Sequence, residues 1–101
     1  MRLERTENGY LVDPTIWSLD VMHKMTKEDK IELSKSQVMQ IEKVRKYYDE
    51  NSYVPKIEEF AEYVGSDKSK LFKEWFTMPM IPITKYGGLA RPSWLPVNNY
   101  K

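Results

Sequence analysis

A helix signal over residues 34–51 is the feature that most constrains how this chain can fold. Ser34 is followed three residues later by Gln37, the spacing of a capping box, in which each side chain bonds the other residue's backbone. Its apolar residues recur at helical spacing: Val38, Ile41, Val44 and Tyr48. Pro55 blocks any continuation. A helix with one apolar face must be covered by other elements, so the sequence predicts a helical body around it.

Other helices are expected on both sides of this segment. Asp13 can cap a helix that has Pro14 at its first position. The expected inner face of that helix carries Ile16, Trp17, Val21 and Met25. Near the C-terminus, Pro79 and Pro82 leave room for at most one helical turn, near residues 82–87.

The N-terminal residues predict a small β-hairpin. Asn8-Gly9 suits a type I′ turn between the segments 3–6 and 10–12. The expected fold class is therefore α+β and mostly α, with an N-terminal β-hairpin, a helical bundle containing a helix-turn-helix, and a flexible C-terminal arm. The expected division is a domain over residues 1–86 and an arm over residues 87–101.

The composition indicates one folded domain. The chain has 101 residues, of which 41% are hydrophobic and 31% charged. No apolar run approaches the roughly 18 residues that a membrane span needs. The N-terminus shows no apolar core of a secretory signal, so a cytoplasmic location is expected.

The sequence offers little for catalysis. There is no cysteine and one histidine, so thiol chemistry, disulfides and cysteine- or histidine-rich metal sites are excluded. Asp20 and His23 lie one helical turn apart, but no nucleophile stands beside them. We therefore expect no enzyme, no catalytic residue, no metal and no cofactor.

Charge is distributed unevenly. The net charge is +1, but residues 68–101 carry six cations against the single anion Glu74. A basic C-terminal third suits an acidic protein surface or a phosphate backbone. The alternative is that these cations only belong to a solvent-exposed helix face and a disordered basic tail, with no partner.

Residues 57–76 have the spacing of a helix-turn-helix. Ala61 allows close helix contact, Gly65 suits the turn, and Leu71 can pack the second helix back on the first. Three lysines of the second helix can meet phosphates: Lys68, Lys70 and Lys73. This helix lacks the Arg, Asn and Gln side chains that read bases, so the motif is equally a way of packing helices.

The C-terminal arm is the second candidate surface. Gly87 and Gly88 can form a hinge, and Trp94 is either a partner anchor or a residue that folds back and pins the tail. The candidate arm residues for partner binding are Gly87, Gly88, Leu89, Arg91, Pro92 and Trp94. Arg45 and Lys85 are candidates for contact with an anion or a partner.

Several segments, taken in order, resemble the DsrC/TusE family of sulfur-relay proteins, which includes the gamma subunit of dissimilatory sulfite reductase. They are "NGYLVDPTIW", "IELSKSQ", "VRKYYDENSYVPKI" and "KYGGLARPS", and the resemblance covers roughly residues 9–95. It implies a β-hairpin, a helical bundle with a helix-turn-helix, and a mobile arm. The implied partner is a siroheme sulfite reductase or another sulfur-transfer protein.

In that family two arm cysteines carry the chemistry. By the resemblance their positions fall on Thr84 and Leu95, neither of which is a thiol. A hydroxyl and an alkyl group cannot hold persulfide sulfur. The leading hypothesis is a non-catalytic accessory or regulatory protein that binds a sulfur-metabolism partner. The alternative is a DNA-binding regulator that uses residues 57–76.

Overall fold

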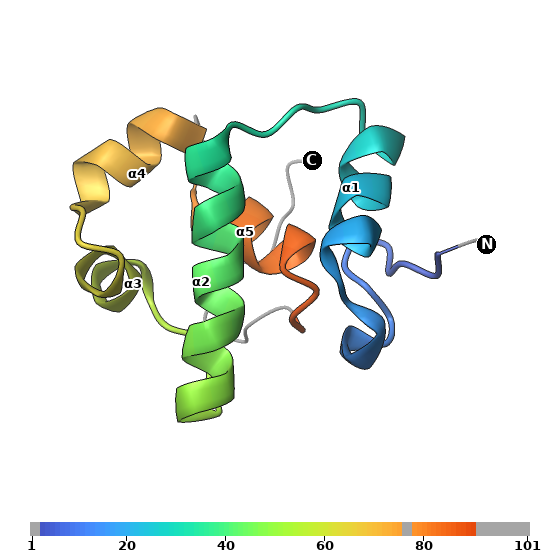
Figure 1. The fold of residues 1–101 in the computed structure, drawn as a ribbon, viewed down its shortest axis with the longest axis horizontal. Coiled ribbons are helices and arrows are strands. Elements are labelled where there is room, and N and C mark those ends of the chain that lie inside the picture. The colour runs from blue at the N-terminus through green and yellow to red at the C-terminus, as the bar shows by residue number, and fades with distance from the viewer. Residues whose placement is uncertain (1–2, 76–77, 91–101) are drawn as a thin grey trace.

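The computed structural model describes residues 3–75 and 78–90. Their regular structure is helical, and Figure 1 shows the order of the elements along the chain. The elements are the 3-10 helix η1 (Pro14–Ile16), α1 (Leu19–Glu28), α2 (Lys35–Asn51), α3 (Ile57–Tyr63), α4 (Lys68–Trp75) and α5 (Met80–Tyr86).

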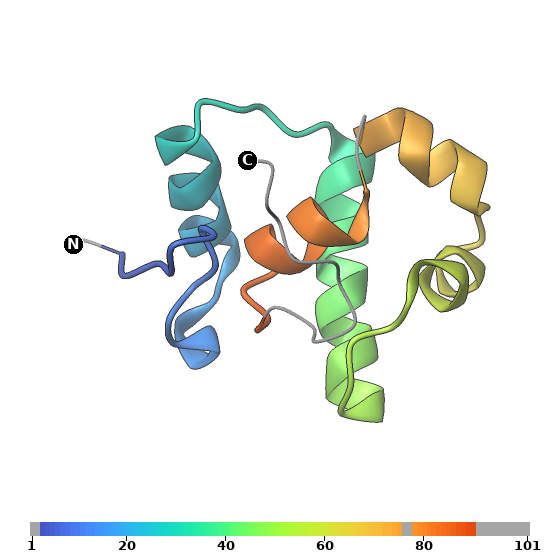
Figure 2. The same cartoon turned by 180° about the vertical axis from the view of Figure 1, so that it is seen from behind.

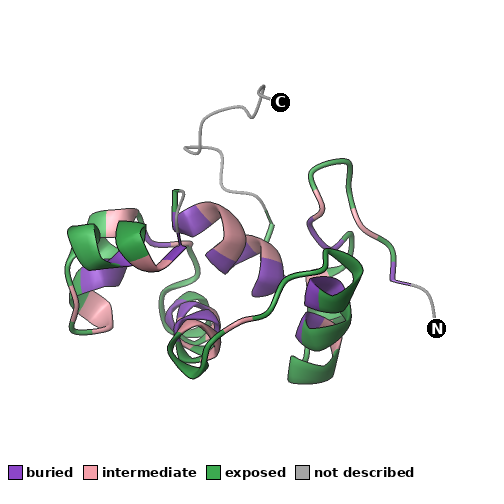
Figure 3. Cartoon of the chain, turned by 90° about the horizontal axis from the view of Figure 1, so that it is seen from above, coloured by how far each residue is buried: buried purple, intermediate pink, exposed green. Residues whose placement is uncertain are grey.

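Helix α2 is the central element. α3 and α4 pack together on one side of it, and α5 lies between α2 and α1 on the other (Figures 1 and 2). Buried faces of α1, α2 and α5 turn toward one another in the view from above (Figure 3). Helix α5 thus joins the N-terminal part of the chain to the central helix.

The predicted β-hairpin, and with it the α+β class, is wrong. Among the described residues the N-terminal segment forms a single bridge between Arg5 and Leu11 and no strand. The turn closes through a hydrogen bond of 2.8 Å from the amide of Gly9 to the carbonyl of Thr6. Gly9 has a φ of 88°, whereas Asn8 is not among the residues with positive φ, so the type I′ turn does not form. A pairing this short makes no sheet, and the fold is all helical in the described chain.

The helix predicted from Asp13 begins where expected and stops early. The Asp13 carboxylate accepts the amide of Thr15, but only the 3-10 turn η1 follows. Trp17 is extended, with a φ of −63° and a ψ of 139°, and the Ser18 side chain caps the new helix α1. Trp17 therefore lies between η1 and α1 and belongs to neither helix.

Helix α2 confirms the capping prediction. The Gln37 side chain accepts the amide of Ser34, and the Ser34 hydroxyl accepts the amide of Gln37, at 2.9 and 3.1 Å. Ile41 and Val44 are fully buried as predicted. Tyr48, predicted on the same face, is 41% exposed, and its neighbour Tyr47 is buried instead.

Helix α5 is longer than its prolines suggested. Pro79 is the N-cap, and Pro82 lies within the first turn. Backbone amides in a first turn have no partner within the helix, so a proline there removes no hydrogen bond. In the part of the chain that the structure describes, no helix is both long and apolar enough to cross a membrane.

Candidate functional site

The start of the C-terminal segment is fixed to the folded body. Gly87, Gly88 and Leu89 are buried. The indole nitrogen of Trp17 donates a hydrogen bond of 2.6 Å to the carbonyl of Tyr86. A Cβ placed on Gly88 would lie 2.4 Å from Cδ1 of Trp17, so only glycine allows this contact. Its φ of 69° also favours glycine.

Arg45 holds the same segment from α2. Its Nη1 donates to the carbonyl of Gly87 at 3.0 Å, and its guanidinium lies 4.9 Å from the centre of the Trp17 ring. Partial burial lowers the pKa of Arg45, while the negative charge of Asp49 opposes this effect. We call Trp17, Arg45, Gly87 and Gly88 the arm clamp, because together they fix the backbone from which residues 91–101 continue.

Thr84 is fully buried in α5. Its hydroxyl donates to the carbonyl of Met80 at 2.6 Å, which leaves its oxygen to accept from the hydroxyl of Tyr10 at 2.8 Å. Two segments that are 74 residues apart in sequence therefore meet through two buried hydroxyls. Both groups are satisfied inside the core, so the Thr84 oxygen is committed to structure.

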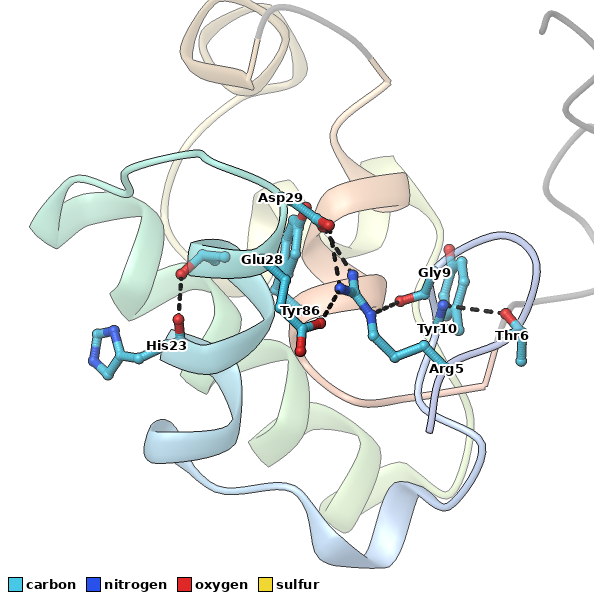
Figure 4. A network of polar contacts seen from close by, with 9 residues as sticks. Arg5, Thr6, Gly9, Tyr10, His23, Glu28, Asp29 and Tyr86 are labelled. Carbon is cyan, nitrogen blue, oxygen red and sulfur yellow. Dashed lines mark hydrogen bonds and ion pairs between the residues drawn. The ribbon is translucent and has the colours of Figure 1, made fainter. Parts of the chain in front are cut away.

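An ionic network ties the N-terminal loop to α1 and α5 (Figure 4). The Arg5 guanidinium contacts Asp29 at 2.8 Å and Glu28 at 2.9 Å, and its Nε donates to the carbonyl of Gly9. The Tyr86 hydroxyl donates to the Asp29 carboxylate at 2.5 Å. Three segments of the chain thus meet at Asp29.

This network shifts the pKa values of its members. Burial is the largest single influence on Asp29 and raises its pKa, but the hydrogen bonds from Arg5 and Tyr86 and the positive charges of Arg5 and Lys85 together outweigh it, so the pKa of Asp29 is lowered. Burial and the bond to Asp29 raise the pKa of Tyr86. Asp29 is therefore held ionised and Tyr86 protonated at neutral pH, as their hydrogen bond requires.

Lys85 lies beside the network without joining it. Its ammonium is 5.3 Å from the centre of the Tyr86 ring, and among the described residues it has no hydrogen bond or ion pair. Burial lowers its pKa, while the charge of Asp29 opposes that shift. Of the two cations predicted to meet an anion or partner, Arg45 donates to backbone carbonyls, whereas Lys85 has neither a hydrogen bond nor an ion pair among the described residues.

The predicted arm residues fall into two groups. Gly87, Gly88 and Leu89 belong to the packed body as described above. Four other residues that the sequence singled out, Arg91, Pro92, Trp94 and Leu95, lie outside the described residues. A partner-binding role for the arm stays a prediction.

The helix-turn-helix elements are present as α3 and α4. Ala61 and Leu71 are buried between them, and Gly65 has a φ of 73°. Lys68 is paired at 3.2 Å with Glu58 of the first helix, which reduces the charge available for phosphate. Lys70 and Lys73 are exposed.

The described residues form no cluster of side chains suited to bind a metal ion. Within residues 3–75 and 78–90, no group of three or more acidic, histidine or cysteine residues could hold an ion. His23 is exposed on α1, and its backbone carbonyl accepts the Thr26 hydroxyl.

Sequence reasoning missed the residues that fix α5. Arg5, Asp29 and Tyr86 carry no local signal, since their partners come from distant segments. Trp17 was placed on a helix face, yet its extended backbone sends it to the arm clamp. The pair Gly87-Gly88 was the available signal for this contact, because glycine often marks a place where a side chain packs closely against the backbone.

The described elements define a class: small helical proteins in which a short helix, here α5, lies between the first α-helix and a long central helix. The sequence model of the family described as "DsrC like protein" matches residues 1–94. This chain therefore belongs to the DsrC-like family. It contains no cysteine.

Solved structures share this fold. DsrC from Allochromatium vinosum matches with a TM-score of 0.80 at 24% identity, covering 93% of this chain and 90% of that one. A dissimilatory sulfite reductase I structure matches with a TM-score of 0.78 at 19% identity, covering 93% and 91%. The oxidized gamma subunit of the dissimilatory sulfite reductase (DsrC) from Archaeoglobus fulgidus matches with a TM-score of 0.77 at 20% identity, covering 89% of each chain. No match was found among the curated proteins.

Proposed function

We propose that this protein binds a partner of sulfur metabolism as an accessory or regulatory subunit and carries no sulfur itself. The partner is a siroheme sulfite reductase or a sulfur-transfer protein. The observation that carries the proposal is the conjunction of membership in the DsrC-like family with a chain that has no thiol. A similar fold is found in a sulfite reductase structure and in a gamma subunit of that enzyme.

The environment of Thr84 supports a structural use of its position. By resemblance, the first arm cysteine of the family corresponds to Thr84, whose hydroxyl is buried and bonded to Met80 and Tyr10. A threonine hydroxyl is not a nucleophile at neutral pH without an adjacent base. Within the described part of the chain, the hydrogen-bond partners of Thr84 are the Tyr10 hydroxyl and the carbonyls of Met80 and Ile81, none of which is a base. The residue is suited to hold α5 in place and unsuited to transfer sulfur.

The arm clamp supports docking through the C-terminal segment. Trp17 and Arg45 bond the backbone carbonyls of Tyr86 and Gly87, so the chain is fixed a few residues before position 91. A partner then meets the segment at a defined position, which lowers the entropy lost on binding. In this proposal the binding residues are Arg91, Pro92 and Trp94, as predicted from the sequence.

Affinity capture tests the proposal. The full-length protein and a version ending at Ala90 are tagged and used to capture partners from native extract at low and high salt. We expect a sulfite reductase or sulfur-transfer enzyme to be retained by the full-length protein and lost with residues 91–101. Equal retention by both versions contradicts docking through the arm, and absence of any such enzyme contradicts the proposed partner class.

A second experiment tests the absence of sulfur carriage. The purified protein is treated with polysulfide, and its intact mass is measured before and after reduction. We expect no added sulfur. The double variant Thr84→Cys, Leu95→Cys is the positive control, since thiolates accept sulfur. Sulfur bound to the unmodified chain would overturn this part of the proposal.

DNA binding by residues 57–76 is the second candidate function. It is favoured by the buried contacts of Ala61 and Leu71 and by the exposed lysines Lys70 and Lys73 of α4. Binding to phosphates weakens steeply with salt. A mobility shift at low salt that is lost in the variant Lys70→Gln, Lys73→Gln would support it. No shift with any duplex at low salt would exclude it.

A further inference from the structure

A groove lies between helix α5 and residues 31–33, which belong to the connection from α1 to α2. Its apolar wall consists of Ile31, Leu33, Trp75, Ile81, Pro82 and Tyr86. Its volume is about 420 Å³, within the range of roughly 300–1,000 Å³ that is common for binding pockets. We call it the connector groove.

The connector groove continues into two neighbouring hollows. It shares Ile31 and Leu33 with a hollow of about 400 Å³ beside α1. It shares Ile31, Lys85 and Tyr86 with a hollow of about 490 Å³ beside the N-terminal loop. The three hollows therefore adjoin one another around Ile31. Adjoining hollows can take successive side chains of one segment, which favours an extended chain over a compact molecule.

Lys85 supplies a free positive charge at one end. It lines both the connector groove and the hollow beside the N-terminal loop, and its ammonium has no hydrogen bond or ion pair among the described residues. The nearest carboxylate network is occupied, because Asp29 is bonded to both Arg5 and Tyr86. A half-buried cation gains most from an anionic partner, since burial costs its charged form free energy.

The side of the connector groove that adjoins the hollow beside α1 carries a negative charge. Glu32 lines the connector groove and the hollow beside α1, and it too has no hydrogen bond or ion pair among the described residues. Lys27 lies along that second hollow. A bound chain therefore has a preferred direction, with its acidic side chain toward Lys85 and the N-terminal loop.

We propose that the connector groove binds an extended segment of a protein partner in which acidic and apolar side chains alternate. The acidic group pairs with Lys85, and an apolar side chain packs between Leu33 and Trp75. The inference rests on the proposed function, in which this chain is a partner-binding protein, and it names a second contact apart from the arm. Charge complementarity then sets the register of the segment.

The probe is a capped pentapeptide in which glutamate alternates with leucine, titrated into the full-length, isotopically labelled protein. We expect shifts of the Trp75 indole N–H and of backbone amides in residues 31–33 and 81–86. The same peptide with glutamine in place of glutamate should bind roughly tenfold to a hundredfold more weakly, as for loss of a hydrogen bond to a charged group. A peptide with alanine in place of leucine should bind more weakly as well.

Matched variants isolate the charge. Lys85→Gln should reduce binding of the glutamate peptide to that of the glutamine peptide, and Lys46→Gln, at an exposed position on α2, should change nothing. Leu33→Ala should weaken all the leucine peptides alike. Circular dichroism confirms that each variant is folded. Absence of shifts at millimolar peptide, or equal shifts with Lys85→Gln, overturns the inference.

The two proposals fail separately. If the peptide does not bind but arm-dependent capture of a sulfur enzyme persists, the connector groove is not a contact site and the proposed function stands. If the peptide binds and no sulfur enzyme is captured, the groove is a docking site for a partner of another class. Competition between the capture partner and the peptide shows that both use this surface.

Discussion

The hydroxyl groups of Tyr10 and Thr84 lie 2.8 Å apart and are buried in the body of the protein. Because the Thr84 hydroxyl donates to Met80, its oxygen accepts from Tyr10. This pair joins the N-terminal loop to helix α5. Thr84, which the sequence resemblance predicts to stand at the position of an arm cysteine of the family, is a point of internal attachment in this structure.

Replacing Thr84 by valine tests that attachment. Thr84→Val keeps the shape but removes the 2.8 Å hydrogen bond of the buried Tyr10 hydroxyl and leaves its longer one, of 3.4 Å, to the carbonyl of Ile81. We expect the free energy of unfolding to fall by about 0.5–1.5 kcal/mol in urea denaturation, as for the loss of one hydrogen bond. With Tyr10→Phe already present, the same change should cost less, and a double-mutant cycle measures the difference. Additive effects would show that the two hydroxyls do not stabilise each other.

Gly88→Ala should be strongly destabilising. The added Cβ would meet Trp17 at 2.4 Å, and the backbone has a φ of 69°. Overpacking costs about 1–3 kcal/mol and a positive φ about 1–2 kcal/mol, so we expect a loss of about 2–5 kcal/mol. Gly65→Ala is the matched control, since its φ of 73° is similar but no atom lies within 4 Å of the new Cβ. Equal losses for the two variants would mean that the contact with Trp17 contributes nothing.

Arg45→Met should loosen the arm clamp locally. The variant removes the hydrogen bond to the Gly87 carbonyl and the contact with the Trp17 ring. We expect faster hydrogen exchange at the amides of Gly88 and Leu89, which bond the last turn of α5, with a smaller change in α3. Lys46→Met on the exposed side of α2 should leave all these rates unchanged. Unaltered exchange at Gly88 in Arg45→Met would contradict the clamp.

The lowered pKa of Asp29 predicts that the stability of the protein depends on pH. Its pKa is lowered below the ordinary value of 3.8, so its contribution is complete above that value and is lost as pH falls through the lowered pKa. The stability advantage of the natural protein over Asp29→Asn should therefore shrink below about pH 4. Chemical denaturation across pH 2 to 7 measures this advantage, and carboxyl NMR titration measures the pKa directly. A constant advantage over the whole range would contradict the assignment.

Local signals predicted the centre of this fold well. The capping box of Ser34 and Gln37 forms as expected, because both partners lie within one turn of each other. Gly65 adopts the predicted positive φ for the same reason. Such features depend on short-range hydrogen bonds and backbone sterics, which a single sequence contains in full.

Long-range contacts explain where prediction failed. Trp17 leaves the helical conformation to bond the carbonyl of Tyr86, which is 69 residues away. The pair Gly87-Gly88 was interpreted as a hinge, yet the same two residues also permit close packing against a distant side chain. Neither the extended backbone of Trp17 nor the close packing of Gly88 could be predicted from the local sequence, because each depends on a contact with a residue far away in the chain.

Helix α5 has a further consequence for how the protein is made. Tyr10, Trp17 and Asp29 each have a hydrogen-bond partner in residues 84–86, close to the end of the described chain. During synthesis, most of the chain must therefore emerge before these three contacts can form. A chain interrupted before α5 lacks the element that closes the fold, so a stalled product would be recognisably incomplete to cellular quality control.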